Sequence, residues 1–349
     1  MAKSFRHPSF PTIFAILLVA FLFFYVSANI LRVAKYWVST NPSVSSPHLN
    51  LSIIFFNPEY KDELLSVLRS ASMADRTVIL TTLNETWAGP GSVIDLFLQS
   101  FRLGEGTERL LTHLVVVAVD RNAFDRCKSI HPHCYFLTTP ASGVEFAAEK
   151  RLVTADHYLS FSRRRIAFLL TVLELGYNFV FTDADVMWLR NPFPHFSLDH
   201  DITSACEIYM GNPEDINNRA DGGFNFVKSN ARSIDLYRYW YMSSFLHPGA
   251  DDLSVFEMIK KDRFVEEIGL EIKYLDTTYF GGFCEPSKDM SKVCTIHANC
   301  CIGMENKLHD IRLILKDWKK FMGTALSVKE KRLNVSTSPW RAPNRCKSW

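Results

Sequence analysis

Short apolar segments alternate with segments of helical periodicity along the chain, and this alternation limits the folds that the chain can adopt. The strand-like segments are 77–83, 113–119 and 177–181, and the helical segments are 93–101 and 163–175. Strands that alternate with helices of this length predict an α/β domain with a largely parallel sheet. Because such sheets bind ligands beyond the carboxyl ends of their strands, the residues that follow each strand are the first candidates for a site.

Residues 11–31 carry no charge and form a nearly continuous apolar run. As a helix, this run spans about 30 Å, the thickness of a bilayer core. A cleaved signal peptide and a buried core helix are the alternatives. The run is long for a signal peptide, and the residues after it make a poor cleavage site. We therefore expect a cytosolic tail at 1–10, a transmembrane signal anchor at 11–31 and a stem rich in turn formers at 32–49.

The remaining residues are predicted to form one globular body at 50–325 and a C-terminal tail at 326–349. The tail is basic and contains prolines, so a solvated segment is the default expectation. The whole chain has a formal net charge of only +2, and its sequence shows no cluster of basic residues typical of nucleic-acid binding. We therefore expect no nucleic-acid partner.

N-glycosylation sequons indicate which side of the membrane holds the body. They begin at Asn50, Asn84 and Asn334, and such sequons are modified only in the secretory lumen. The positive charges on the two sides of the apolar run nearly balance, so they do not set the orientation. The sequons and the short N-terminal tail together favour a single-pass type II protein with a lumenal body.

Eight cysteines lie in the predicted body and tail. In an oxidising lumen they are expected to form disulfides rather than remain free. Cys127 and Cys134 flank a short loop and are the first candidate pair; Cys284 and Cys294 are the second. Spacing does not decide the pairing of the others.

An acidic pair follows the apolar segment 177–181. Asp183 and Asp185 are separated by one residue, so in an extended backbone both side chains point to the same side and can converge on one cation. Magnesium-like and manganese-like ions take such carboxylates together with substrate phosphates. A pair of solvated carboxylates is the alternative. The preceding strand and the following apolar residues favour a metal site.

A second candidate segment, 293–303, combines cysteines with His297. Two interpretations compete. In the first, Cys284, Cys294, Cys300 and Cys301 form a zinc site with His297. In the second, the cysteines form disulfides and His297 joins the metal site of the two aspartates, which the lumenal assignment favours. Lys307 follows at a distance suited to a phosphate, with a solvated lysine as the alternative.

Glycine and further acidic residues supply the remaining candidates. Gly222 and Gly223 either let the backbone approach a ligand or form a turn, and the strand-like residues 224–227 behind them suggest a loop that enters a strand at the site. Asp251 and Asp252 are either site carboxylates or a helix N-cap.

Several motifs together identify a family resemblance. They are HLVVVAVD (113–120), FTDADVMWLRNPF (181–193), DGGFNFVKSN (221–230), LDTTYFGGFCE (275–285) and CTIHANCCIGMENKLHDIRLILKDW (294–318). With these motifs the chain resembles the plant nucleotide-diphospho-sugar transferase group of glycosyltransferase family 77. The DAD stretch is shared by many transferases, whereas the HANCC ending with FGGFC is far more specific.

The resemblance implies a GT-A fold, which is an α/β fold with a Rossmann-like mixed sheet flanked by helices, in a Golgi membrane protein. It implies a UDP-sugar donor and a cofactor, Mn²⁺ or Mg²⁺. The metal ligands would be Asp183, Asp185 and His297. The donor-binding residues would be Asp120, Asp183, Asp185, Gly222, Gly223 and Lys307, and the catalytic candidates Asp252, Asp251 and Asn225. The segment HPGADDLSVF departs from the shorter form of the group, so the choice between Asp251 and Asp252 stays open.

The function expected from this resemblance is transfer of a sugar, a pentose or galactose, with retention of configuration to a cell-wall polysaccharide or glycoprotein. Two alternatives remain open: a metal-dependent nucleotide-sugar hydrolase, and a non-catalytic partner that binds donor or glycan. The sequence also leaves open whether the protein forms homo- or hetero-oligomers.

Overall fold

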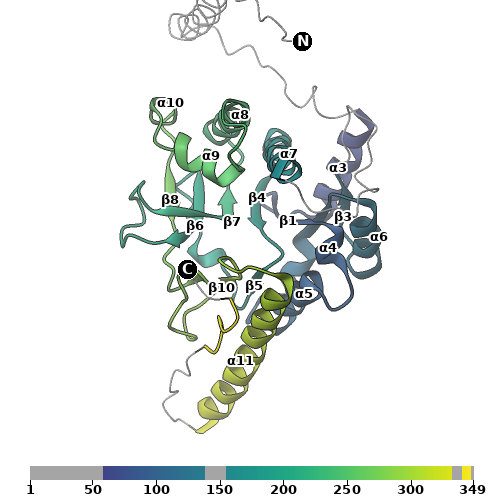
Figure 1. The fold of residues 1–349 in the computed structure, drawn as a ribbon, viewed down its shortest axis with the longest axis vertical. Helices are drawn as coiled ribbons and strands as arrows, with labels where there is room; N and C mark the ends of the chain where they lie inside the picture. Colours follow the sequence, from purple (N-terminus) through teal and green to yellow (C-terminus); the bar gives the residue numbers. More distant parts are fainter. Residues whose placement is uncertain (1–57, 138–154, 332–339, 347–349) are drawn as a thin grey trace, which may run out of the picture. The chain divides into compact units, whose positions relative to one another are not determined.

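The computed structural model describes residues 58–137, 155–331 and 340–346. Within these ranges the chain forms an α/β body with one seven-stranded sheet and one three-stranded sheet (Figure 1). No helix in the described ranges is long and apolar enough to span a bilayer. The predicted anchor at 11–31, the stem at 32–49 and the sequons at Asn50 and Asn334 lie outside the described residues.

The large sheet is mixed, with the strand order β3-β2-β1-β4-β7-β6-β8. Its strands, in sheet order, are β3 (Cys134–Phe136), β2 (Leu114–Ala118), β1 (Thr77–Leu83), β4 (Asn178–Thr182), β7 (Arg219–Val227), β6 (Ile202–Ile208) and β8 (Ile272–Tyr274). The first four are mutually parallel, β7 runs antiparallel to both of its neighbours, and β8 is parallel to β6. The predicted α/β class is confirmed.

Strand β7 corrects one detail of the sequence prediction. The glycine pair Gly222–Gly223 was expected in a loop ahead of a strand at 224–227, but β7 already begins at Arg219. The pair therefore lies inside the strand, in the stretch where the register between β6 and β7 shifts. Glycine in a strand interior is typical of places where another group approaches the backbone closely.

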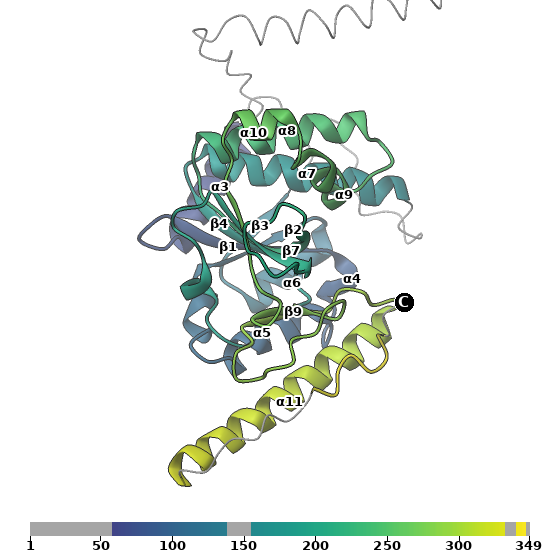
Figure 2. The ribbon, with the colours of Figure 1, turned by 90° about the vertical axis from the view of Figure 1, so that its left-hand side faces the viewer.

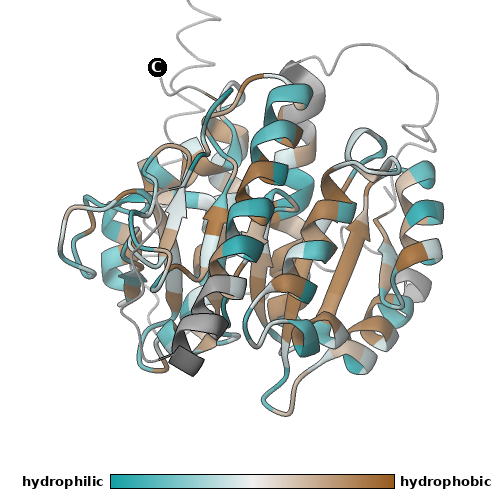
Figure 3. Cartoon of the chain, turned by 90° about the horizontal axis from the view of Figure 1, so that it is seen from below, coloured by the Kyte–Doolittle hydropathy of each residue, from teal (hydrophilic) through white to brown (hydrophobic). Residues whose placement is uncertain are grey.

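Helices cover both faces of the large sheet (Figure 2). On one face lie α7 (Ala155–Glu174), α8 (Ala231–Leu246), α9 (Asp252–Ile259) and α10 (Arg263–Glu267). On the other lie α5 (Val93–Leu103) and α11 (Met304–Lys331), together with the small sheet. The remaining helices are α3 (Pro58–Ala71), α4 (Glu85–Ala88), α6 (Arg121–Ile130) and two short 3₁₀ helices, Glu108–His113 and Phe193–His195. The central strands are hydrophobic, while the helices alternate hydrophobic and hydrophilic positions (Figure 3), as expected for strands buried on both faces.

The small sheet consists of β5 (Val186–Trp188), β10 (Thr295–His297) and β9 (Phe280–Gly282), in that order. Trp188 at the end of β5 is fully buried. Its ring stacks on Phe101 of α5 with centroids 4.6 Å apart and meets Phe224 of β7 edge-on at 5.5 Å. This aromatic contact fixes the small sheet against the large one, so the loop between β4 and β5 is held at both ends.

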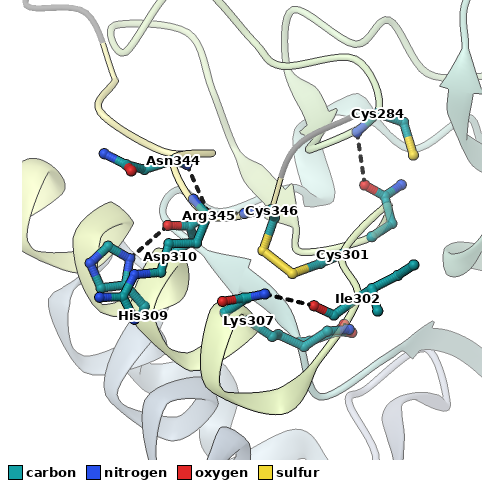
Figure 4. The surroundings of a disulfide bond; sticks show 12 residues. Cys284, Cys301, Ile302, Lys307, His309, Asp310, Asn344, Arg345 and Cys346 are labelled. Carbon is teal, nitrogen blue, oxygen red and sulfur yellow. Dashed lines mark hydrogen bonds and ion pairs between the residues drawn. A yellow bond between two sulfur atoms is a disulfide. The ribbon is translucent and has the colours of Figure 1, made fainter. Parts of the chain in front are cut away.

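The C-terminal segment 340–346 is not a solvated tail. Asp310 of α11 is fully buried and accepts backbone hydrogen bonds from Asn344, Arg345 and Cys346, at 2.7–2.8 Å (Figure 4). The predicted boundary at residue 325 falls inside α11, which ends at Lys331. The basic composition of this region did not reveal that buried carboxylates of α11 hold the segment.

Candidate active site

The acidic pair lies in the turn that leaves the large sheet. β4 ends at Thr182 and β5 begins at Val186, so Asp183 and Asp185 sit between two strands of different sheets. The backbone N–H of Asp183 donates to the carbonyl of Gly223 at 2.8 Å, which extends the pairing of β4 with β7. The side chain of Asp185 is 2% exposed and that of Asp183 is 25% exposed. The carboxylate of Asp185 is therefore buried, and that of Asp183 is only partly exposed.

His297 reaches this turn because of strand register. β10 pairs antiparallel with β5, and His297 lies opposite Val186. The next residue, Ala298, donates its N–H to the carbonyl of Asp185 at 3.0 Å. The imidazole Nε2 consequently lies 3.3 Å from Oδ1 of Asp185 and 4.0 Å from Oδ2 of Asp183. The three residues that the sequence analysis named as metal ligands are brought together.

Lys307 completes the contacts of Asp185 from a third element. It lies in the first turns of α11, and its ammonium forms an ion pair with Oδ2 of Asp185. The same ammonium lies 5.1 Å from the ring centroid of Trp87 in α4. The lysine therefore contacts the acidic pair and is not a solvated surface residue.

Asp221 is a site residue that the sequence analysis did not assign. Its carboxylate oxygens lie 2.8 and 2.9 Å from Nδ1 of His297, on a side chain that is 6% exposed. Gly223 lies two residues after Asp221 on β7. A Cβ atom at this position would lie 2.4 Å from Cε1 of His297 and 2.9 Å from Oδ2 of Asp183. The motif Asp-Gly-Gly thus supplies both a hydrogen-bond acceptor and the space that the imidazole occupies.

Arg165 is the second unassigned residue, and it joins Asp252 to the acidic pair. Its Nε donates to Oδ2 of Asp252 at 2.6 Å, and one of its terminal nitrogens lies 3.5 Å from Oδ1 of Asp183. The side chains of Arg165 and Asp252 are 12% and 5% exposed. The run Arg163-Arg164-Arg165 was a visible signal, but its helical position alone did not show which arginine faces the sheet.

The electrostatics of the cluster reflect burial and opposed charges. Burial raises the pKa of Asp183 to about 6, although Arg165 acts against this. Burial also opposes ionisation of Asp185, but the positive charges of His297 and Lys307 outweigh it and lower the pKa of that carboxyl. Burial likewise disfavours a charged His297, yet Asp221 and Asp185 hold the pKa of the imidazole well above its usual value.

Three side chains of the site are suited to bind a divalent cation. Asp183, Asp185 and His297 each offer one ligand atom, and these atoms lie within 4.8 Å of one another. Oδ1 of Asp185 is buried and has no hydrogen-bond partner among the described residues, although a buried carboxylate oxygen normally has one. A cation coordinated by this oxygen and by Nε2 of His297 would satisfy both atoms.

Other predicted residues have local structural contacts. Asp251 is the N-cap of α9 and accepts the N–H of Ser254 at 2.8 Å, so the N-cap alternative holds for Asp251, while Asp252 contacts the site. Asp120 caps α6 through the N–H of Ala123 at 2.8 Å.

The remaining candidates lie on β7 and at α4. Asn225 sits on β7 opposite Phe181, with a buried Oδ1 that has no hydrogen-bond partner among the described residues. Gly222 faces Leu253 of α9. Asn84 is exposed and caps α4 by accepting the N–H of Trp87 at 3.1 Å.

The disulfide bonds exclude the zinc-site interpretation of the cysteines. The predicted pair Cys127–Cys134 is confirmed, whereas Cys284 is bonded to Cys300 and not to Cys294. The reason is register: β9 and β10 are parallel with Gly282 opposite His297, so the chain just beyond each strand brings Cys284 beside Cys300. Cys294, at the other end of β10, is buried as a free thiol, as is Cys206. The third bond, Cys301–Cys346, ties the loop after β10 to the C-terminal segment (Figure 4).

Comparison with known proteins identifies the family to which the chain belongs. The uncharacterized Arabidopsis thaliana protein At4g15970 is 46% identical over 305 residues, which cover 87% of this chain and 79% of that protein. A second uncharacterized Arabidopsis thaliana protein, At1g28695, is 38% identical over a region that covers 77% of this chain and 81% of that protein. The Arabidopsis thaliana UDP-D-xylose:L-fucose alpha-1,3-D-xylosyltransferase is 28% identical over a region that covers 30% of this chain and 28% of that enzyme. The profile of the nucleotide-diphospho-sugar transferase family matches residues 109–311, more than half of the sequence, and the chain therefore belongs to this family of glycosyltransferases.

Proposed function

We propose that the protein transfers a sugar from a UDP-sugar to a glycan or glycoprotein acceptor, with retention of configuration and with Mn²⁺ or Mg²⁺ bound at Asp183, Asp185 and His297. The observation that carries the proposal is the convergence on Asp185. His297 from β10 and Lys307 from α11 both reach its carboxylate, and one carboxylate oxygen has no hydrogen-bond partner among the described residues.

The chemistry follows from the charges that develop when the sugar–phosphate bond breaks. When bound, a divalent cation supplies positive charge beside the departing diphosphate. Lys307 adds a second positive charge on the same side, which stabilises the leaving group further. Because the sugar ring becomes cationic, it needs an oxygen-rich environment, as in glycoside hydrolysis.

Asp252 is the carboxylate that we assign to the sugar ring. It is 4% exposed and is held by Arg165, which also contacts Asp183, so it lies one side chain away from the metal ligands. In this proposal the departing phosphate oxygen accepts the proton of the acceptor hydroxyl. The reaction then needs no separate protein base.

The proposed donors come from the relatives. One similar protein from Dictyostelium discoideum is a UDP-galactose:fucoside alpha-3-galactosyltransferase. It is 28% identical over a region that covers 40% of this chain and 25% of that enzyme. Others, including the xylosyltransferase reported above, use UDP-D-xylose. A pentose or galactose is therefore the donor sugar that we propose, with a cell-wall polysaccharide or glycoprotein as the acceptor.

We also propose a single-pass type II location in the Golgi membrane with the body in the lumen. The apolar run at 11–31, the sequons and three disulfides in the body support this location, because disulfides persist in oxidising compartments. An N84Q variant that abolishes a glycosidase-sensitive shift in mobility would support it. Full protease sensitivity of the body in sealed microsomes would contradict it.

The decisive experiment incubates the full-length protein in detergent with a panel of UDP-sugars, Mn²⁺ and candidate acceptors. The expected product is a glycoside whose anomeric configuration, followed by NMR, matches that of the donor. An Asp185→Asn variant is expected to lose this activity by at least 100-fold, because the substitution removes the charge that holds the cation. Inversion of configuration would contradict the retaining assignment.

The same experiment separates the two alternative functions. A metal-dependent hydrolase would release free sugar phosphate and form no glycoside. A non-catalytic partner would retain its biological function when both Asp183 and Asp185 are replaced by alanine. Rescue of a loss-of-function line by that double variant would therefore remove the catalytic proposal.

A further inference from the structure

We propose that Asp221 is a positioning residue that fixes the tautomer and the ring orientation of His297, so that Nε2 is presented to the divalent cation. This inference rests on the proposed function, because it assumes that the cluster of Asp183, Asp185 and His297 binds a metal. It assigns a defined task to a residue of β7 that lies outside that cluster.

The argument starts from the two ring nitrogens. A carboxylate accepts hydrogen bonds and does not donate them. Both oxygens of Asp221 lie within 2.9 Å of Nδ1 of His297, so Nδ1 carries the hydrogen. In a neutral imidazole the lone pair is then on Nε2. This is the nitrogen that lies 3.3 Å from Oδ1 of Asp185.

Asp221 is itself held in place by its own strand. The backbone N–H of Gly223 donates to Oδ1 of Asp221 at 2.8 Å, and the residue is 5% exposed. Asp221 and Gly223 are two residues apart in a strand and therefore point to the same face. The first orients the imidazole, and the second leaves room for it, because a Cβ at Gly223 would collide with the ring.

Asp221 acts through His297 rather than as a ligand. It contacts the Nδ1 edge of the ring, whereas the cluster of ligand atoms lies at the Nε2 edge. Carboxylates that accept a hydrogen bond from a metal-binding histidine typically raise its basicity, and their removal costs about 10–100-fold in metal affinity.

The test measures Mn²⁺ binding by the full-length protein in detergent, without any donor. Titration followed by electron paramagnetic resonance gives the Mn²⁺ affinity. Pulsed electron paramagnetic resonance detects the hyperfine coupling between Mn²⁺ and the nitrogen of a bound imidazole. We expect Asp221→Ala to weaken Mn²⁺ binding by about 10–100-fold and to reduce the nitrogen coupling. Asp221→Asn keeps an acceptor oxygen without the charge, so its loss should be smaller.

Asp201→Asn is the matched control. Asp201 is also a fully buried aspartate, but it precedes β6 at the end of the sheet away from the site, where it pairs with Arg232. Its replacement should leave the Mn²⁺ affinity unchanged, so a loss confined to the Asp221 variants supports positioning over general destabilisation.

Two outcomes would overturn the inference in distinguishable ways. If the unmodified protein binds Mn²⁺ with imidazole coupling and both Asp221 variants do the same with equal affinity, the positioning role alone is refuted. If the unmodified protein does not bind Mn²⁺ at all, the metal-dependent function is refuted, and the role of Asp221 with it.

Discussion

Gly223 and His297 approach each other so closely that a single methyl group does not fit between them. A Cβ atom at Gly223 would lie 2.4 Å from Cε1 of the imidazole. Gly223 lies on β7 of the large sheet and His297 on β10 of the small sheet, so this approach depends on how the two sheets pack. Residue 223 therefore controls whether the imidazole can reach the acidic pair.

Gly223→Ala should accordingly displace His297 and weaken Mn²⁺ binding by at least 10-fold, with a loss of stability of about 1–3 kcal/mol from overpacking. The adjacent variant Gly222→Ala is the control, because its Cβ would meet Leu253 at an ordinary distance of 3.5 Å. Calorimetric titration with Mn²⁺ compares the two. Equal affinities for both variants would show that the close approach does not matter for the metal.

Lys307→Ala should reduce kcat by about 100-fold, because it removes a fixed positive charge where negative charge develops. The buried carboxylate of Asp185 would also lose its ion pair. Lys319→Ala, at an exposed position of the same helix, should leave kcat unchanged. Steady-state kinetics with a saturating donor measures the effect, and a Lys307→Ala enzyme with full kcat would exclude the lysine from catalysis.

Arg165 and Asp252 should be energetically coupled. Both are largely buried, and replacing either one breaks the ion pair between them, at a cost of about 3 kcal/mol. The double variant Arg165→Met/Asp252→Asn should lose at least about 1 kcal/mol less than the sum of the single losses. Urea unfolding of the four proteins completes the cycle. Additive losses would indicate that the two side chains act independently.

The disulfide Cys301–Cys346 should contribute more stability than Cys127–Cys134. The first closes a sequence separation of 45 residues and the second one of 7. Loop-closure entropy predicts contributions of about 4 and about 2 kcal/mol respectively. Thermal unfolding of Cys346→Ser and Cys127→Ser under oxidising conditions tests this order. The reverse order would mean that the hydrogen bonds to Asp310 hold the C-terminal segment without the disulfide.

Asp201 should make folding stability depend on pH. Burial opposes its ionisation, but hydrogen bonds from Arg232, Glu271 and Asn230 outweigh this and lower the pKa of the carboxyl. A carboxyl with a lowered pKa contributes stability above its unfolded pKa of about 4 and loses it as the pH falls toward the folded value. The stability difference between the unmodified protein and Asp201→Asn should therefore be larger at pH 7 than at pH 3. Urea unfolding at both pH values checks this, and a constant difference would exclude the charge of Asp201 as its source.

Local sequence signals determined a substantial part of this protein. The strands β1, β2 and β4 and the helices α5 and α7 follow from apolar runs and helical periodicity, since neighbouring residues fix these patterns. The metal candidates Asp183 and Asp185 are predicted from alternation in an extended chain, but the structure places them in a turn between β4 and β5, so the residues are right and the local conformation is not. His297 and Lys307 are predicted from the motif that contains them.

Only the tertiary structure decided which distant segments meet. The pairing of β10 with β5 brings His297 to Asp185, and the parallel pairing of β9 with β10 joins Cys284 to Cys300 rather than to Cys294. Asp221 and Arg165 became site residues because strand and helix packing aim their side chains at the cluster. Sequence spacing does not contain this information, because register and packing arise from contacts between residues far apart in the chain.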